Sequence, residues 1–119
     1  PQMDIFEGQF EKSESGYVYR IGEVGIDLPV NIIPADKPLD MGIRSEHVRL
    51  GNSGFSASVR LVQPVGPFTY VTVGWQGGSV TARVNGISHL KPRDPVRVEF
   101  MPESLLFFDR ENENRVDLY

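Results

Sequence analysis

The chain has 119 residues, including 12 glycines and 9 prolines, which is the size of one domain and the composition of a fold rich in turns. Sixteen acidic residues against twelve basic ones give a formal net charge of −4, which argues against a protein that coats nucleic-acid phosphates or an anionic membrane. The absence of cysteine excludes a disulfide framework, a thiolate zinc site and a cysteine nucleophile.

Apolar and polar residues alternate along most of the first half of the chain, which predicts β-strands and no real helix. A first strand is expected over residues 5–12, and a polar loop that ends in Gly16 leads into a second strand over residues 17–21. A third strand is expected over residues 24–30, with Pro29 near its end because proline lacks an N–H group.

A loop and a turn interrupt the strands in the middle of the chain. Residues 31–39 are expected to form a loop, because they include Pro34 and Pro38. A short strand over residues 41–44 then leads into a single turn at residues 45–47, after which the chain resumes an extended conformation.

The second half alternates more regularly. The apolar residues of segment 55–61 face one way, and the two consecutive apolar residues Leu61 and Val62 predict a β-bulge. The pair Gly77 and Gly78 is the strongest hairpin signal in the chain. Further strands are expected over residues 68–76, 80–84, 96–100 and 105–108, followed by a polar tail.

Strands spaced about ten to twelve residues apart and joined by glycine and proline turns predict an all-β fold, a small closed barrel of the oligonucleotide/oligosaccharide-binding (OB) type. A β-sandwich is the alternative. We expect one domain over residues 1–119, and the start without an initiator methionine suggests a fragment of a longer chain. The expected core comprises Phe10, Ile21, Ile43, Val59, Leu61, Val71, Val73, Val84, Val98 and Phe100.

The sequence contains no recognisable catalytic motif. There is no Gly-Lys-Ser/Thr phosphate-binding loop, so the chain is expected neither to bind nor to hydrolyse ATP and is not predicted to be an enzyme. His47 and His89 lie in unrelated turns, and no metal site is expected.

Charge is distributed unevenly along the chain. Residues 41–101 contain three acids and seven bases, whereas both flanking segments are acidic. Arg44, Arg60 and Arg83 could therefore contact a small anion. Alternatively, the arginines pair with acids of the terminal segments across neighbouring strands.

Three stretches in this order carry a family resemblance: residues 1–8 (PQMDIFEG), residues 41–48 (MGIRSEHV), and residues 91–98 (KPRDPVRV) followed by 106–109 (LFFD). They resemble the "P-x-M-N", "G-hydrophobic-R-P-E-H" and "K-P-G-D … F-D" motifs in the C-terminal regulatory domain of the ATP-binding subunits of sugar-type ABC importers, the maltose and glycerol-3-phosphate transporter class. The resemblance spans nearly the whole chain and implies the transport-associated OB (TOBE) fold.

Four positions depart from the family pattern. Asp4 replaces asparagine, Ser45 replaces proline, Arg93 replaces glycine, and Phe68 stands where relatives often have an acid. The hydroxyl of Ser45 keeps a turn possible. Arg93 would be strained if its position requires a positive φ.

The resemblance implies a regulatory and dimerisation domain appended to an ATPase domain that this chain lacks. In the family, two such domains meet about a two-fold axis, and some members also receive regulatory proteins. The implied partners are a second copy of the full-length subunit, a regulatory protein, and the transporter's membrane subunits through the ATPase domain. The implied location is cytoplasmic, peripheral on the inner face of the plasma membrane, with ATP and Mg in the parent chain and no cofactor in this one.

The residues expected at the interface lie in one charged turn and one late strand. They are Arg44, Ser45, Glu46, His47, Leu105, Phe107, Phe108 and Asp109.

Two other functions remain open from the residues. A small-anion (oxyanion) module related to molybdate-binding domains would use Arg44, Arg60 or Arg83. A single-strand nucleic-acid binder would stack bases on Phe68, Tyr70 and Trp75, but the acidic net charge disfavours it. Trp75 also fits a place in the core, which is the commoner outcome for tryptophan.

Overall fold

Strands dominate the computed structural model, which describes residues 2–34 and 36–118. They make up 58% of the described residues, and two 3₁₀ turns account for 5%, so the expectation of an all-β fold with little helix is confirmed. Pro1 of the first motif and Ala35 of the expected loop lie outside the described residues, as does Tyr119. No helix in the described part of the chain is long and apolar enough to cross a membrane.

The elements follow one another along the chain with these bounds: β1 (Met3–Phe6), β2 (Gln9–Ser13), β3 (Gly16–Ile21), β4 (Val24–Asp27), β5 (Leu39–Arg44), η1 (Ser45–His47), β6 (Val48–Gly51), β7 (Phe55–Pro64), β8 (Phe68–Trp75), β9 (Gly78–Asn85), β10 (Pro95–Phe100), η2 (Pro102–Ser104), β11 (Leu106–Asp109) and β12 (Arg115–Val116).

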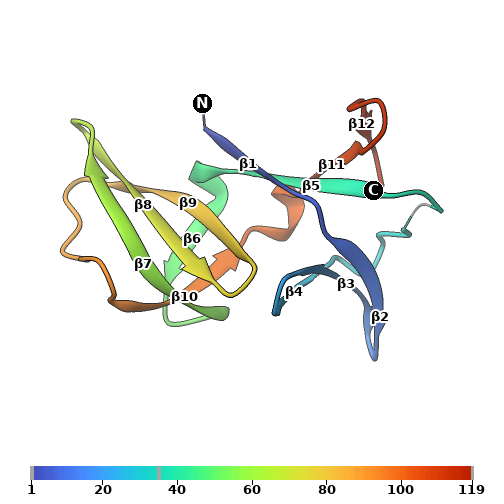
Figure 1. Ribbon diagram of the computed structural model, residues 1–119, viewed down its shortest axis with the longest axis horizontal. Helices are drawn as coiled ribbons and strands as arrows, with labels where there is room; N and C mark the ends of the chain where they lie inside the picture. Colours follow the sequence, from blue (N-terminus) through green and yellow to red (C-terminus); the bar gives the residue numbers. More distant parts are fainter. Residues whose placement is uncertain (1, 35, 119) are drawn as a thin grey trace.

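The strands form three antiparallel sheets, in the orders β1-β5-β11-β12, β6-β10-β7-β8-β9 and β2-β3-β4. The five-stranded sheet and the β2–β4 sheet lie toward opposite ends of the long axis, and β1 and β5 run between them (Figure 1). The expected closed barrel is not formed, because no ladder of backbone hydrogen bonds among the described residues joins the three sheets into a ring.

The first difference from the expected strands is at Gly8, where one expected strand is divided into two. The single strand expected over residues 5–12 is two strands, of which β1 pairs with β5 and β2 pairs with β3. A Cβ at Gly8 would lie 2.2 Å from the carbonyl oxygen of Arg20 and 2.6 Å from the ring of Tyr19. Only glycine fits this close approach, and the chain changes sheets there.

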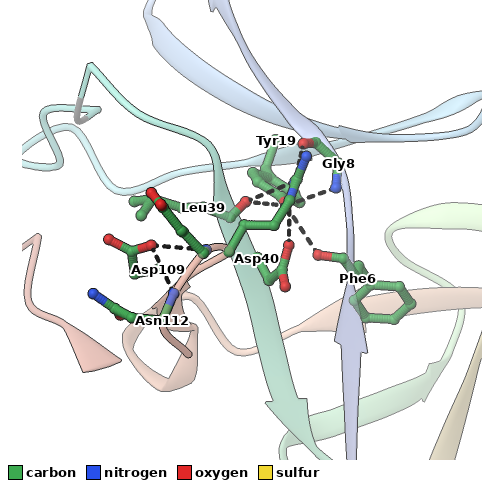
Figure 2. A network of polar contacts seen from close by, with 9 residues as sticks. Phe6, Gly8, Tyr19, Leu39, Asp40, Asp109 and Asn112 are labelled. Atoms are coloured by element: carbon green, nitrogen blue, oxygen red, sulfur yellow. Dashed lines mark hydrogen bonds and ion pairs between the residues drawn. The ribbon is translucent and has the colours of Figure 1, made fainter. Parts of the chain in front are cut away.

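A buried polar network holds that junction together (Figure 2). The hydroxyl of Tyr19 accepts a hydrogen bond from Gly8 N (2.7 Å) and can donate to the carbonyl of Phe6 (3.0 Å) or Leu39 (2.7 Å). Arg110 donates to Asp40 (2.6 Å) and to the carbonyls of Gly8 (2.8 Å) and Leu39 (3.1 Å). Residues of β3 and β5 therefore meet residues in or next to β1 and β11 in one place.

A β-bulge lies in β7, as expected, but between Val59 and Leu61 rather than at the pair Leu61 and Val62. The earlier position changes which side chains face inward. Leu61 pairs with Thr72 and is 47% exposed, so the expectation that Leu61 belongs to the core is wrong. Val62 packs partly against the core in its place.

Most of the expected core is confirmed. Ile21, Ile43, Val59, Val71, Val73, Val98 and Phe100 are buried, while Phe10 and Val84 are partly buried and pack against the core. Trp75 is buried as well, and its indole nitrogen donates to the carbonyl of Ile21 at 2.9 Å. Its ring packs against Phe6 and Phe55, with the ring centroids 6.3 and 5.0 Å apart. Trp75 therefore belongs to the core and offers no face for stacking a nucleic-acid base.

Candidate interaction surface

The charged turn expected at residues 45–47 is the 3₁₀ turn η1, between β5 and β6. Its first residue, Ser45, is 2% exposed and donates its backbone N–H to the carbonyl of Gln2 at 3.1 Å. Proline, the usual family residue, lacks this donor. The turn is therefore fixed to the start of β1 through the backbone of Ser45, and it packs against β9.

Glu46 is the electrostatic centre of this turn. A hydrogen bond from its own backbone N–H lowers the pKa of the Glu46 carboxyl, and the nearby charges of Arg83, His47 and Arg44 lower it further. Glu46 is therefore ionised at neutral pH and lies within reach of two arginine charges. One of these, Arg83, comes from β9 and is far from the turn in sequence.

An aromatic pair continues the surface from Arg83 onto β8. The guanidinium carbon of Arg83 lies 5.1 Å from the ring centre of Phe68, within cation–π distance. Phe68 meets Tyr70 edge-on, with the ring centroids 5.4 Å apart. Tyr70 and Arg83 are cross-strand neighbours. Phe68, the residue that replaces an acid in the family pattern, thus supplies a ring where a carboxylate would have faced Arg83.

His47 completes the turn. Its backbone carbonyl accepts a hydrogen bond from Met101 N at 3.1 Å. Its ring atom Nδ1 is buried and has no hydrogen-bond partner among the described residues. We refer below to Arg44, Glu46, His47, Phe68, Tyr70 and Arg83 as the turn surface.

The late strand expected at the interface lies mostly inside the molecule. Leu105 and Phe107 are each 1% exposed, so their side chains are not available to a partner, contrary to the expectation. Phe108 is half-buried, and its ring lies over Gly42, where it would be 2.9 Å from an added Cβ.

Asp109 belongs to the structural network at the other end of β5. Its carboxylate accepts hydrogen bonds from Glu111 N (2.8 Å) and Asn112 N (3.3 Å), as Figure 2 shows, and pairs with Lys37 at 2.7 Å. Lys37 and these backbone donors lower the pKa of Asp109. In the sheet Asp109 is opposite Leu39, five residues and about 16 Å along the strand from Arg44. The structure does not bring Asp109 to the charged turn.

The three arginines considered for an anion are not all together. Arg44 and Arg83 both act on Glu46, whose negative charge opposes the binding of an anion between them. Arg60 lies over Gly74, and its Nη2 atom is 3.4 Å from the carbonyl of Trp75. Trp75 is five residues along β8 from Tyr70, the neighbour of Arg83, a separation of about 16 Å. One small anion cannot bind both Arg60 and Arg83.

The described residues contain no group of three or more histidines, aspartates or glutamates that could hold a metal ion. The turn surface brings together opposite charges, an aromatic pair and a half-buried histidine. None of these groups has the nucleophile and base arrangement of a catalytic site.

The chain is similar to known proteins over most of its length. A family model described as TOBE domain matches residues 41–108, a range that contains every residue of the turn surface. The sn-glycerol-3-phosphate import ATP-binding protein of Chromobacterium violaceum is 33% identical over 122 aligned positions, which cover 98% of this chain and 32% of the relative. The chain therefore spans about a third of the length of the curated relative that it matches.

Proposed function

The chain belongs to the TOBE domain family, and from that premise we propose that it is the regulatory and dimerisation domain of the ATP-binding subunit of a sugar-type ABC importer. The observation that carries the proposal is the match over 98% of the chain to an import ATP-binding protein. ATP and Mg bind in the parent subunit's ATPase domain, and that domain contacts the transporter's membrane subunits. The whole subunit is peripheral on the cytoplasmic face of the membrane.

A physical requirement supports the dimerisation role. A pair of ATPase domains that separates in each cycle needs a second interface that stays closed, and two-fold symmetric pairing is the commonest solution. The turn surface fits such a contact, because it contains both signs of charge on a turn fixed by backbone hydrogen bonds. In a two-fold pair, Arg44 of one copy meets Glu46 of the other, and the reciprocal contact follows from the symmetry.

The test uses the complete ATP-binding subunit that contains this chain, in the nucleotide-free state. Arg44→Glu should shift the subunit toward monomer and reduce solute uptake by the reconstituted transporter, because like charges then meet across the two-fold axis. The double variant Arg44→Glu with Glu46→Arg should restore both, because it exchanges the two charges.

The matched control is Arg115→Glu, which makes the same charge change at an exposed position in β12. It should leave dimerisation and uptake unchanged. Equal dimerisation of all four proteins would show that the turn surface is not the dimer interface.

A further inference from the structure

A groove with a volume of about 470 Å³ lies between the β2–β4 sheet and the five-stranded sheet. Apolar residues from both sheets line it: Ile26 of β4, Phe55 of β7, and Val98 and Phe100 of β10. Phe55 packs edge-on against Phe100, with the ring centroids 5.7 Å apart. The groove therefore has an apolar floor that belongs to the aromatic part of the core.

One wall of the groove is an unpaired strand edge. β4 is the last strand of its sheet. Along an antiparallel strand, every second residue directs its N–H and carbonyl groups toward the neighbouring strand. Leu28 N donates to the carbonyl of Tyr17 at 3.1 Å, so Val24 and Ile26 also direct their peptide groups toward β3. The peptide groups of Gly25 and Asp27 point the other way, and no backbone hydrogen bond in the described part of the chain uses them. Two N–H donors and two carbonyl acceptors are thus left free along the groove.

The rim of the groove is acidic. Asp27 and Glu99 both line it, and neither forms a salt bridge with any described residue. A smaller adjoining pocket shares Glu99 and adds Glu103, with Arg49 as the one basic residue in its lining. Two arginines balance part of this charge, because Arg49 is opposite Glu99 in the sheet and Arg97 donates to the carbonyl of Gly54 in the lining at 3.1 Å. The carboxylate of Asp27 is therefore the feature of the rim that favours a cationic side chain in a partner.

We propose that this groove binds an extended segment of another protein, which adds as a fourth strand to the free edge of β4. Strand addition satisfies the free peptide groups of Gly25 and Asp27 with backbone bonds and leaves specificity to alternate side chains. The side chain opposite Ile26 points toward the floor formed by Phe55 and Phe100, because opposite residues share a face of the sheet.

The neighbouring side chain of the bound segment points outward beside Asp27. A lysine or arginine there meets the carboxylate of Asp27 across the strands, a favourable pair. The guanidinium of Arg20 lies beside Gly25, 3.4 Å from where a Cβ of that residue would be. Its positive charge disfavours a second cationic side chain opposite Gly25. The recognised pattern is therefore an apolar residue followed or preceded directly by a basic one.

The groove shares no residue with the turn surface. Its occupation by a basic segment does not depend on the proposed dimerisation, and the failure of either proposal leaves the other standing.

The first experiment titrates the isotopically labelled 119-residue chain with the capped peptide acetyl-Val-Lys-Val-Thr-Val-amide and follows the backbone amide resonances. The single lysine of this peptide can pair with Asp27 while the neutral threonine lies opposite Gly25. Saturable shifts should centre on residues 24–27 and on the groove lining. A peptide with glutamate in place of lysine should bind at least about tenfold more weakly. A peptide with N-methylated backbone nitrogens should not bind, because it cannot complete the hydrogen-bond ladder.

Two variants test the strand edge directly. Gly25→Pro removes the outward N–H of Gly25 without removing a bond to β3, because proline is tolerated on a free edge. It should weaken binding of the lysine peptide by about tenfold or more. Gly25→Ala keeps the N–H and meets only ordinary contacts, so it should bind as the parent chain does.

A charge reversal tests the rim without touching the backbone. Asp27→Lys should weaken binding of the lysine peptide and strengthen binding of the glutamate peptide, whereas Asp36→Lys, at an exposed position outside the groove, should change neither. Absence of saturable binding, shifts centred elsewhere, or equal affinity of Asp27→Lys for both peptides would each overturn the proposal.

Discussion

Arg93 adopts a backbone conformation that suits glycine. Its φ angle is 80°, in the left-handed region. Two hydrogen bonds to Val59 fix the turn in this shape: Arg93 N donates to the carbonyl of Val59 (2.7 Å), and Val59 N donates to the carbonyl of Asp94 (2.9 Å). The family motif has glycine at this position, and the structure shows the conformational reason for that preference.

We predict that Arg93→Gly stabilises the chain by about 0.5 to 1 kcal/mol. Relief of the left-handed strain is worth about 1 to 2 kcal/mol, and the greater freedom of glycine in the unfolded chain offsets part of it. The midpoint of thermal unfolding should rise by about 2 to 5 °C.

Arg93→Ala is the control for this prediction, because it removes the side-chain charge and keeps the Cβ that causes the strain. A similar stabilisation by alanine would mean that the charge of Arg93, not its backbone, limits stability.

Asp4 is a second residue where this chain departs from its family. Its carboxylate accepts a hydrogen bond from Thr81 N at 2.8 Å, in a half-buried position. Burial raises the pKa of Asp4, and the hydrogen bond only partly opposes that shift. An acid whose pKa is raised on folding stabilises the fold below its unfolded pKa, and this contribution is lost as the pH rises through its folded pKa.

Asp4→Asn should therefore unfold at a higher temperature than the parent chain at about pH 7, with the difference vanishing near about pH 3. Asparagine keeps an oxygen acceptor for Thr81 N and has no charge to bury. Asp36→Asn, at an exposed position, provides the reference for removing one negative charge. A destabilising Asp4→Asn at neutral pH would mean that the charged hydrogen bond outweighs the cost of burial.

At the scale of elements, two turns from different sheets touch through glycines. Glu23 N donates to the carbonyl of Gln76 at 3.1 Å, which joins the β3–β4 turn to the β8–β9 turn. Gly22 has a φ of 62°, and a Cβ there would lie 2.5 Å from the carbonyl oxygen of Gln76 and 2.6 Å from the Cα of Gly77. This contact joins the β2–β4 sheet to the five-stranded sheet.

Gly22→Ala should destabilise the chain by at least about 2 kcal/mol, because it adds a backbone clash to an unfavourable φ. Gly66→Ala isolates the two effects, since Gly66 also has a positive φ (92°) but has open space around it. It should cost only about 1 kcal/mol. Urea unfolding of both variants measures the difference, and equal losses would show that the two turns move apart at little cost.

Most strands could be predicted from alternation, but their partners could not. The hairpin at Gly77 and Gly78 and the turn at residues 45–47 follow from local residue preferences, and both are present. The break at Gly8 depends on Tyr19 and Arg20, which approach it only in the folded chain. The two-residue strand β12 lies in the polar tail, where a segment so short shows no alternation.

The same limit applies to the turn surface. The charged turn was visible because three polar residues interrupt an extended segment. The contact between Arg83 and Phe68 was not visible, because it joins two strands and depends on how β8 and β9 pair. Leu105 and Phe107 were expected at an interface because apolar residues follow one another there, but both side chains are buried in the core.

At the scale of the whole molecule, the core uses most of the large apolar side chains. The exposed large ones are scattered over separate segments, at Ile5, Val30, Ile33, Leu61, Val65 and Ile87. The chain has an accessible surface of 7342 Å², so a standard interface of about 800 Å² per partner would need roughly a tenth of it. The turn surface supplies charge and two aromatic rings to such a contact, with few apolar residues beside them.

We therefore expect the isolated 119-residue chain to self-associate weakly. It should be a monomer in dilute solution, or a dimer with a dissociation constant in the micromolar range or above. The isolated chain has neither an ATPase domain nor membrane subunits to raise the effective concentration of its partner. Sedimentation velocity over about a hundredfold range of concentration measures this equilibrium. Arg44→Glu or Glu46→Arg should remove the residual association, and raised salt should weaken it, because an interface that relies on exposed charges is screened. A tight dimer that neither substitution affects would place the interface on another part of the surface, with the free edge of β4 as the next region to test.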